Sequence, residues 1–183
     1  RRRKMSVKKF LLFLFFVFTL AEISIACVGK TIYIGHLSGK NDEILGNILS
    51  RLITERTGTS VKLKKYTDAN SLLKASTGGE IDIFVIDDKF ISETTGSKNR
   101  EEAKNAYNVN YNLVWLKAIN EKDDFLVPVI RKDTLKKFPA LPRLLEKLTG
   151  IINNPQIEEI KLDVEKRGMK DAVKDFLKKK SLI

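Results

Sequence analysis

Three aspartates beside one apolar run are side chains whose spacing could support chemistry. Asp82 lies near the start of Ile81–Ile86, and Asp87 and Asp88 follow the end of that run. Open α/β sheets place ligands at the carboxyl ends of their strands, so carboxylates there could bind a cation. A strand rises about 3.3 Å per residue, which puts Asp82 too far back to share that edge. Asp87 and Asp88 have two possible roles, a ligand site or the cap of the next turn, and capping is the commoner one.

Residue types for nucleophilic or metal chemistry are scarce. The chain has one histidine, His36, and one cysteine, Cys27. A lone histidine does not assemble a His-paired nucleophile or a zinc cluster. Gly35–Asn41 has the strand-loop-helix setting of a phosphate-binding loop, but its glycines are too close together and Asn41 stands where a hydroxyl is needed. We therefore expect no catalytic residue, no metal and no cofactor, and predict that the protein is not an enzyme.

Aromatic side chains could form a cage for a quaternary ammonium group, because its charge is attracted to ring faces. Trp115 and Tyr33 fall inside expected strands, where packing in the core is the usual role of such residues. Tyr66, Tyr107 and Tyr111 are the remaining candidates. Cage and core therefore stand as alternative roles for these rings.

The first 26 residues have the pattern of a secretory signal peptide. A basic start is followed by the uncharged apolar run Phe10–Ala21 and by the small residues Ser24 and Ala26 of Ser24-Ile25-Ala26. The apolar run is shorter than the roughly 20 residues of a membrane-spanning helix. Cys27 follows directly, so it is either the site of a lipid anchor or a free thiol at a mature N-terminus. We expect residues 1–26 to be a signal and residues 27–183 to form one exported domain.

The charge of the chain is strongly positive but does not indicate nucleic acid. The sequence has 34 basic and 23 acidic residues, a formal net charge of +11. After residues 1–26, 28 basic and 22 acidic residues remain. Such a surplus spread over helices is typical of a solvated surface, and nucleic-acid binding would need a basic stripe with exposed aromatics. We therefore predict no nucleic-acid partner.

Strand and helix patterns alternate after residue 30, which predicts a parallel-dominated α/β sheet flanked by helices. Residues 92–100 are polar and predict a loop. Pro128 cannot donate to a sheet ladder, so its strand should lie at an edge or in a crossing segment. The expected strands are 31–35, 61–66, 81–86, 113–119 and 125–131, the expected helices lie near 42–57, 68–77 and 101–109, and the chain from Asp133 onward should be helical.

Several segments, in order, resemble the substrate-binding proteins of glycine betaine, choline and carnitine ABC transporters. They are Ile44–Leu49, Ser71–Ala75, Gly79–Ile83, Asn112–Lys117, Val127–Asp133, Phe138–Pro139, Leu144–Leu148 and Ala172–Leu177. The resemblance implies a type II periplasmic-binding fold. In that family a second lobe is inserted between the segments like Leu113–Lys117 and Val127–Val129, whereas here the short charged turn Asn120–Asp124 joins them. The sequence thus predicts a single lobe.

The resemblance also implies where a ligand would bind, at loops that follow strands. We expect Ser38, Thr67, Asp68 and Asp87 to be the ligand-binding residues. The family usually carries a cage tyrosine after the strand that matches Ile81–Val85, and this chain has Ile86–Phe90 at that place.

Two functions follow from the resemblance. The first is an extracytoplasmic solute-binding component of an ABC importer for quaternary-ammonium osmoprotectants, which would work with a permease and be held at the membrane by a lipid on Cys27. The alternative is a one-lobed, membrane-tethered protein-interaction module that has lost its ligand.

Overall fold

The structure is a computed structural model that describes residues 31–121 and 125–183. The expected signal peptide, residues 1–26, and the expected lipid-attachment residue Cys27 lie outside the described residues. Thr31–Ile183 forms one unit. The strands are β1 (Ile32–Leu37), β2 (Val61–Tyr66), β3 (Ile83–Ile86), β4 (Leu113–Trp115) and β5 (Val127–Arg131). The helices are α2 (Lys40–Thr57), α3 (Ala69–Thr77), α4 (Asp88–Thr95), α5 (Arg100–Asn110), α6 (Lys132–Lys137), α7 (Leu141–Leu145), the 3-10 helix η1 (Glu146–Leu148), α8 (Asn154–Arg167) and α9 (Met169–Lys179).

The described strands form one sheet in the order β2-β1-β3-β5-β4. β1 is parallel to β2 and β3, while β5 is antiparallel to both of its neighbours, β3 and β4. It follows that β4 runs in the same direction as β1 to β3 and that β5 alone is reversed. This arrangement confirms the predicted sheet, in which one strand direction dominates.

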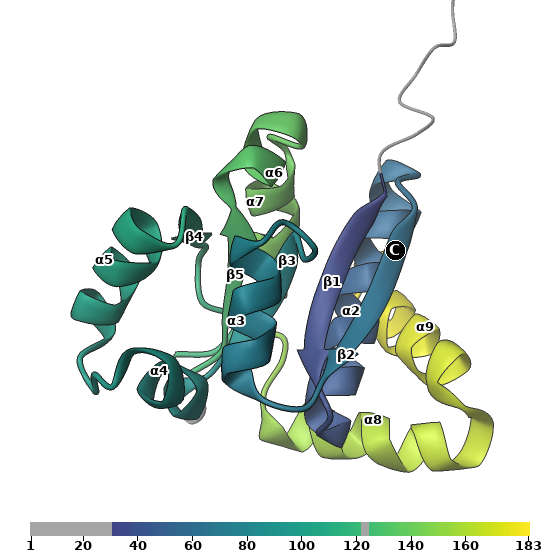
Figure 1. Cartoon of the computed structure of the whole chain (residues 1–183). Helices are drawn as coiled ribbons and strands as arrows, with labels where there is room; N and C mark the ends of the chain where they lie inside the picture. The colour runs from purple at the N-terminus through teal and green to yellow at the C-terminus, as the bar shows by residue number, and fades with distance from the viewer. Residues whose placement is uncertain (1–30, 122–124) are drawn as a thin grey trace, which may run out of the picture. The chain divides into compact units, whose positions relative to one another are not determined.

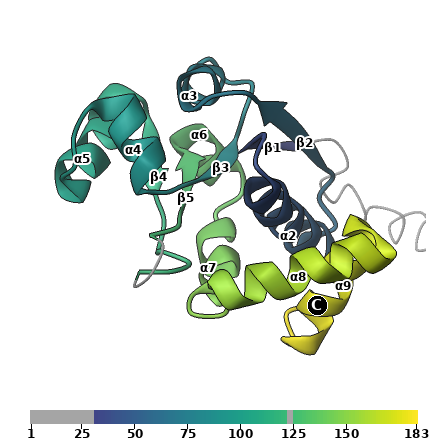
Figure 2. The ribbon, with the colours of Figure 1, turned by 90° about the horizontal axis from the view of Figure 1, so that it is seen from below.

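Helices cover both faces of the sheet, as Figures 1 and 2 show. α2, α7, α8 and α9 pack on one face, and α3, α4 and α5 pack on the other. Alternate strand residues supply the two cores: Ile34 and Ile83 contribute to the first, and Phe84 and Val129 to the second. The period-two alternation is what lets one sheet bury both faces. Two apolar layers therefore hold the strands that end at the candidate site.

β4 and β5 are direct neighbours, with Trp115 paired to Val129. Beyond β4 the chain continues to a bridge between Asn120 and Leu126, so only residues 116–126 separate the two strands. The predicted direct joining of these two segments, without an inserted lobe, is therefore confirmed.

The strand of Pro128 does not lie at an edge, so the edge alternative of the prediction was wrong. β5 sits between β3 and β4, and Pro128 is opposite Val85 of β3. The Leu116 N–H donates to the Pro128 carbonyl at 2.9 Å. The proline nitrogen therefore also faces Leu116, the residue that directly follows the end of β4 at Trp115. β4 ends at Trp115, so the proline removes only the one hydrogen bond that it could have donated toward Leu116, and the strand keeps its interior place.

Residues 88–95 form a helix where the sequence predicts the start of a loop at Ser92, so the predicted loop begins too early. Phe90 and Ile91 of α4 are both 2% exposed and pack in the second core. Asp87 caps the helix, and Gly96 ends it with a φ of 70°. One apolar pair and a signal at each end hold the helix. Its sequence is too short to show a helical period of apolar residues, so the sequence pattern did not indicate it.

Gly35, the first glycine of the segment Gly35–Asn41, is explained by packing. A Cβ at this position would lie 2.3 Å from Cδ1 of Leu72 in α3. Glycine therefore lets α3 approach β1 closely, and the segment continues as strand to Leu37 before α2 begins at Lys40.

Candidate functional site

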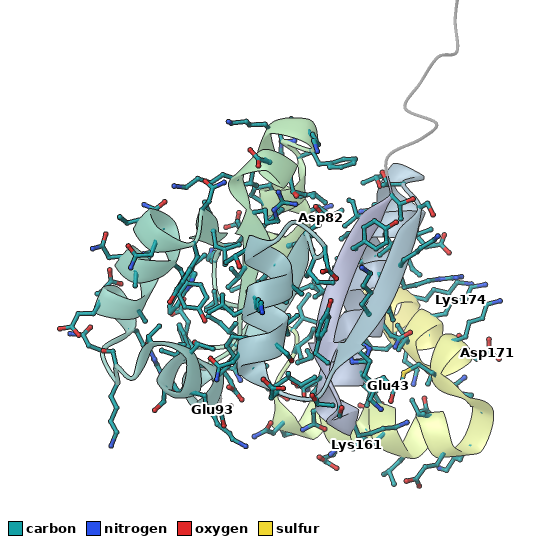
Figure 3. All side chains as sticks on the ribbon, viewed as in Figure 1. Glu43, Asp82, Glu93, Lys161, Asp171 and Lys174 are labelled. Atoms are coloured by element: carbon teal, nitrogen blue, oxygen red, sulfur yellow. The ribbon has the colours of Figure 1, made fainter. Side chains whose placement is uncertain are left out.

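A cavity of about 310 Å³ opens where β1, β2 and β3 end and α2, α3 and α4 begin. We call it the strand-end cavity. It is lined by Leu37, Asp42, Thr67, Asp68, Ala69, Val85, Ile86, Asp87, Lys89, Phe90, Glu93 and Leu126. Figure 3 shows one of these residues, Glu93, at the opposite end of the sheet from Asp82. The cavity thus occupies the edge at which open α/β sheets bind ligands.

Three of the four predicted ligand residues meet in this cavity. Thr67 and Asp68 reach it from the end of β2, and Asp87 reaches it from the end of β3. Ser38 does not line it. The Ser38 hydroxyl instead donates a hydrogen bond to the Tyr66 carbonyl at 3.0 Å. Ser38 therefore ties the ends of β1 and β2 together beside the cavity.

Asp68 and Asp87 also cap helices. Asp68 accepts from the Ser71 N–H at 2.8 Å at the start of α3, and Asp87 accepts from the Phe90 N–H at 2.7 Å at the start of α4. The Thr67 hydroxyl donates to the second carboxylate oxygen of Asp68 at 3.0 Å. These hydrogen bonds, led by the one from the Ser71 backbone, hold the pKa of Asp68 below its usual value. Asp68 therefore stays charged in the cavity wall.

Asp42, Glu93 and Lys89 are cavity residues that the sequence did not single out as ligand residues. Asp42 lies in the first turn of α2, and burial raises its pKa, with the nearby Asp87 carboxylate raising it further. The only sequence signal was the acidic start of α2, which equally suits a helix N-terminus. With four carboxylates and one ammonium, the described lining is net negative.

Asp82 lies at the far end of β3, as the strand spacing predicts. Its carboxylate accepts from the Tyr33 N–H at 2.9 Å and from the Thr134 hydroxyl at 2.6 Å. Arg131 lies 3.8 Å away and also donates to the Gly79 carbonyl at 3.2 Å. Asp82 therefore joins β1, β3 and α6 and has no part in the cavity.

The candidate cage aromatics lie elsewhere. Tyr107 packs against Tyr111 at 5.7 Å and Trp115 at 5.5 Å between ring centroids, and Trp115 contacts Phe125 at 6.0 Å. Burial raises the pKa of Tyr107 to about 12, and its hydroxyl pairs with Thr94 at 2.9 Å. These rings and the half-buried Tyr33 and Tyr66 belong to the second core or pack against it. Of the cavity's lining residues, Phe90 alone is aromatic.

Asp88 and Arg100 brace α4 from outside the cavity. Arg100 donates to both oxygens of Asp88 at 2.7 and 2.6 Å, and its guanidinium lies 3.9 Å from the Phe125 ring centroid. Hydrogen bonding to Arg100 lowers the pKa of Asp88. Of the two aspartates that follow β3, Asp87 is the cap, and Asp88 holds α4 to α5.

In the described part of the chain, no three His, Cys, Asp or Glu side chains are grouped to hold a metal ion. Nor does any helix in residues 31–121 or 125–183 combine the length and apolar character needed to cross a membrane.

Comparisons with known proteins agree with the fold and with the resemblance drawn from the sequence. Residues 103–179 match the family model described as the substrate binding domain of ABC-type glycine betaine transport system. The apo form of YehZ from Escherichia coli has a TM-score of 0.70 at 11% identity, with 85% of this chain and 100% of that chain covered. A second solved structure, a glycine betaine/carnitine/choline ABC transporter, has a TM-score of 0.70 at 11% identity, with 85% of this chain and 99% of that chain covered.

At that identity the structural likeness concerns the fold, and it confirms the predicted α/β lobe of the type II periplasmic-binding kind. The family match covers most of α5, then β4, β5 and the helices that follow β5, and the strands that end at the cavity precede it. No curated protein sequence matches the chain.

Proposed function

We propose that this chain, whose residues 103–179 match the substrate-binding domain of ABC-type glycine betaine transport systems, is the extracytoplasmic solute-binding component of such a system, an importer. The observation that carries the proposal is the strand-end cavity, because it lies where this kind of fold binds ligands. A permease in the membrane would be its partner.

The charge of the cavity supports a cationic solute. Asp42, Asp68, Asp87 and Glu93 line it against the single ammonium of Lys89. A quaternary-ammonium solute such as choline meets this negative lining with one positive charge. Glycine betaine carries a carboxylate as well, which the same lining repels. We therefore propose that choline-type cations bind better than betaine.

Apolar lining supports the rest of such a solute. The partly exposed Leu37, Val85 and Leu126 line the cavity beside the carboxylates. Phe90 lines it too but is only 2% exposed, so it offers little ring face to a methylated ammonium. Attraction to carboxylates would thus replace most of what an aromatic cage supplies.

Calorimetric titration of the protein with choline, carnitine, glycine betaine and proline tests this proposal. Trp115 does not line the cavity, so heat is a better readout than its fluorescence. We expect choline to bind most tightly and Asp87→Asn to weaken it by about tenfold, a loss of about 1.4 kcal/mol. Asparagine still caps α4, so this change removes charge and leaves the cap. Asp171→Asn, an exposed change on α9, is the control.

No heat with any of these solutes at millimolar concentration would reject solute binding. The alternative, a one-lobed interaction module without ligand, would then be preferred. It has one structural argument in its favour: Asp68 and Asp87 are already occupied as helix caps.

Export and anchoring belong to the same proposal. The basic start, apolar run and small residues of 1–26 support a signal peptide, and Cys27 directly after them supports a lipid anchor at the outer face of the cytoplasmic membrane. Labelling cells with a radioactive fatty acid should mark the protein, and Cys27→Ala should abolish the label. An unlabelled wild-type protein would leave Cys27 as a free thiol.

A further inference from the structure

A second hollow, of about 190 Å³, lies between α2 and α9. We call it the α2–α9 groove. Its lining residues are Asn47, Ser50, Arg51, Thr54, Lys170 and Val173. No carboxylate is among them, whereas the strand-end cavity has four. All but Val173 carry a side chain that can donate a hydrogen bond. The groove is therefore an electropositive site rich in donors.

Arg51 has unused capacity to donate in this groove. Its Nη2 contacts Glu55 at 2.7 Å, one turn along α2. Its Nε is buried and has no hydrogen-bond partner among the described residues. The Nε is closed off from solvent, but the Nη1 group has no hydrogen bond or ion pair among the described residues and is not buried, so it is the part of the guanidinium that can donate to a ligand in the groove.

Lysines extend the positive surface along α9. Lys170, Lys174 and Lys178 are spaced by four residues, which places them on one side of the helix. None of the three has an ion pair within residues 31–121 and 125–183, while Lys179 pairs with Glu159 at 3.8 Å. Figure 3 shows Lys174 projecting from α9 away from the sheet, with Asp171 on the same helix.

We infer that the α2–α9 groove binds an oxyanion of the phosphate type through Arg51 and Lys170. A guanidinium and an ammonium are the side chains that bind phosphate most strongly, and the Ser50 and Thr54 hydroxyls add donors. At about 190 Å³ the groove has room for a small anion such as phosphate. This inference is independent of the solute proposed for the strand-end cavity.

Two sources could supply this group, free phosphate or the headgroup of an anionic phospholipid. The groove recognises the chemistry that both share. The lysine row would add attraction to a charged membrane surface and little to a single small ion, since exposed charges act over about 8–10 Å. Separate measurements with the two sources therefore distinguish them.

Calorimetry with inorganic phosphate, on the full chain in phosphate-free buffer, tests the first source. We expect binding that weakens about tenfold in Arg51→Gln and in Lys170→Gln. Lys62→Gln removes an exposed lysine of β2 that forms no ion pair among the described residues, and it should bind as the wild type does. Thermal melting of each variant shows whether it folds.

Flotation with phosphatidylcholine vesicles, with and without phosphatidylglycerol, tests the second source. Residues 1–26 are apolar and begin with a basic segment, so they can bind anionic lipid themselves. The readout is therefore the change, from the wild type to each variant, in the increase of binding that the anionic lipid causes. Loss of that increase in Arg51→Gln and Lys170→Gln, but not in Lys62→Gln, supports the headgroup as the source. Binding of phosphate alone supports the free ion. Absence of both, or binding that is equal in all variants, overturns the site.

Discussion

Asp42 shows how one side chain in the strand-end cavity is conditioned by its neighbours. It lies in the first turn of α2, and within the described residues no other residue donates a hydrogen bond to its carboxylate. Burial raises its pKa, and the Asp87 carboxylate raises it further, while His36 and Lys89 act in the opposite direction. Negative charge at this position thus costs stability in the absence of a cation. The same charge favours binding of a cation.

We expect Asp42→Asn to stabilise the protein at neutral pH and to have little effect in acid. A raised pKa means that the stability contributed by this group is fully present below its ordinary pKa of about 3.9 and is lost as pH rises through the raised value. Urea unfolding of both proteins between pH 3 and pH 7 measures this. The free energy of unfolding should diverge as pH rises, with the variant higher. Divergence in the opposite direction would show that Asp42 is stabilised as a charged group.

At the scale of elements, α4 separates the strand-end cavity from a more open hollow. Phe90 and Glu93 face the strand-end cavity. Ile91 and Ser92 line the more open hollow, together with residues of α5, and this hollow is distinct from the α2–α9 groove. A short helix with open space on two sides depends on few contacts. Three contacts set its position: the Asp87 cap, the packing of the Phe90 ring on the Phe84 ring with 5.6 Å between their centroids, and the Asp88–Arg100 ion pair. α4 therefore controls both the shape of the cavity and the position of Asp87.

Removing the Phe90 ring should destabilise the protein strongly. Phe90 is 2% exposed, and a buried Phe→Ala change costs about 3–5 kcal/mol because it loses apolar burial and leaves a cavity. Urea unfolding should show this loss for Phe90→Ala. Val109→Ala is the control, because Val109 is 69% exposed on the neighbouring α5 and should change stability by less than about 0.5 kcal/mol. A similar small loss in both variants would mean that α4 packs loosely.

Elements with a clear period could be predicted from the sequence, and elements set by contacts could not. β2 matches its predicted range, 61–66, and α2 ends before Gly58 as predicted, because each has a regular pattern and an end signal. α4 has one apolar pair and no period. The interior place of Pro128 depends on where β4 ends, which is a property of the neighbouring strand.

The candidate site divides in the same way. The rule that loops after parallel strands meet at one edge of the sheet predicts that Thr67, Asp68 and Asp87 lie close together, and all three line one cavity. Asp42 and Glu93 enter the cavity from helices, so their presence depends on how α2 and α4 are placed on the sheet. Asp82 was assigned correctly to the opposite end because strand geometry alone decides its position.

The whole described unit is one lobe built on a sheet with a core on each face. Trp115 pairs with Val129, so β4 and β5 are adjacent in the sheet at the place where the family that the sequence resembles has its second lobe inserted. β5 contributes Ile130 to one core and Val129 to the other, so both cores depend on this strand. Loss of β5 would therefore disrupt the packing on both faces of the sheet.

We therefore expect the lobe to unfold in a single cooperative transition. Trp115 is the only tryptophan of the chain and packs against the second core, so its fluorescence reports on α5, β4 and β5. Far-UV circular dichroism is dominated by the helices, of which α2, α8 and α9 cover the opposite face. In urea the two signals should give the same midpoint and the same slope, because a shared strand couples the cores. A fluorescence transition that precedes the loss of helix would show that α4, α5 and β4 form a separate, weaker unit, as expected if that side required a second lobe for its stability.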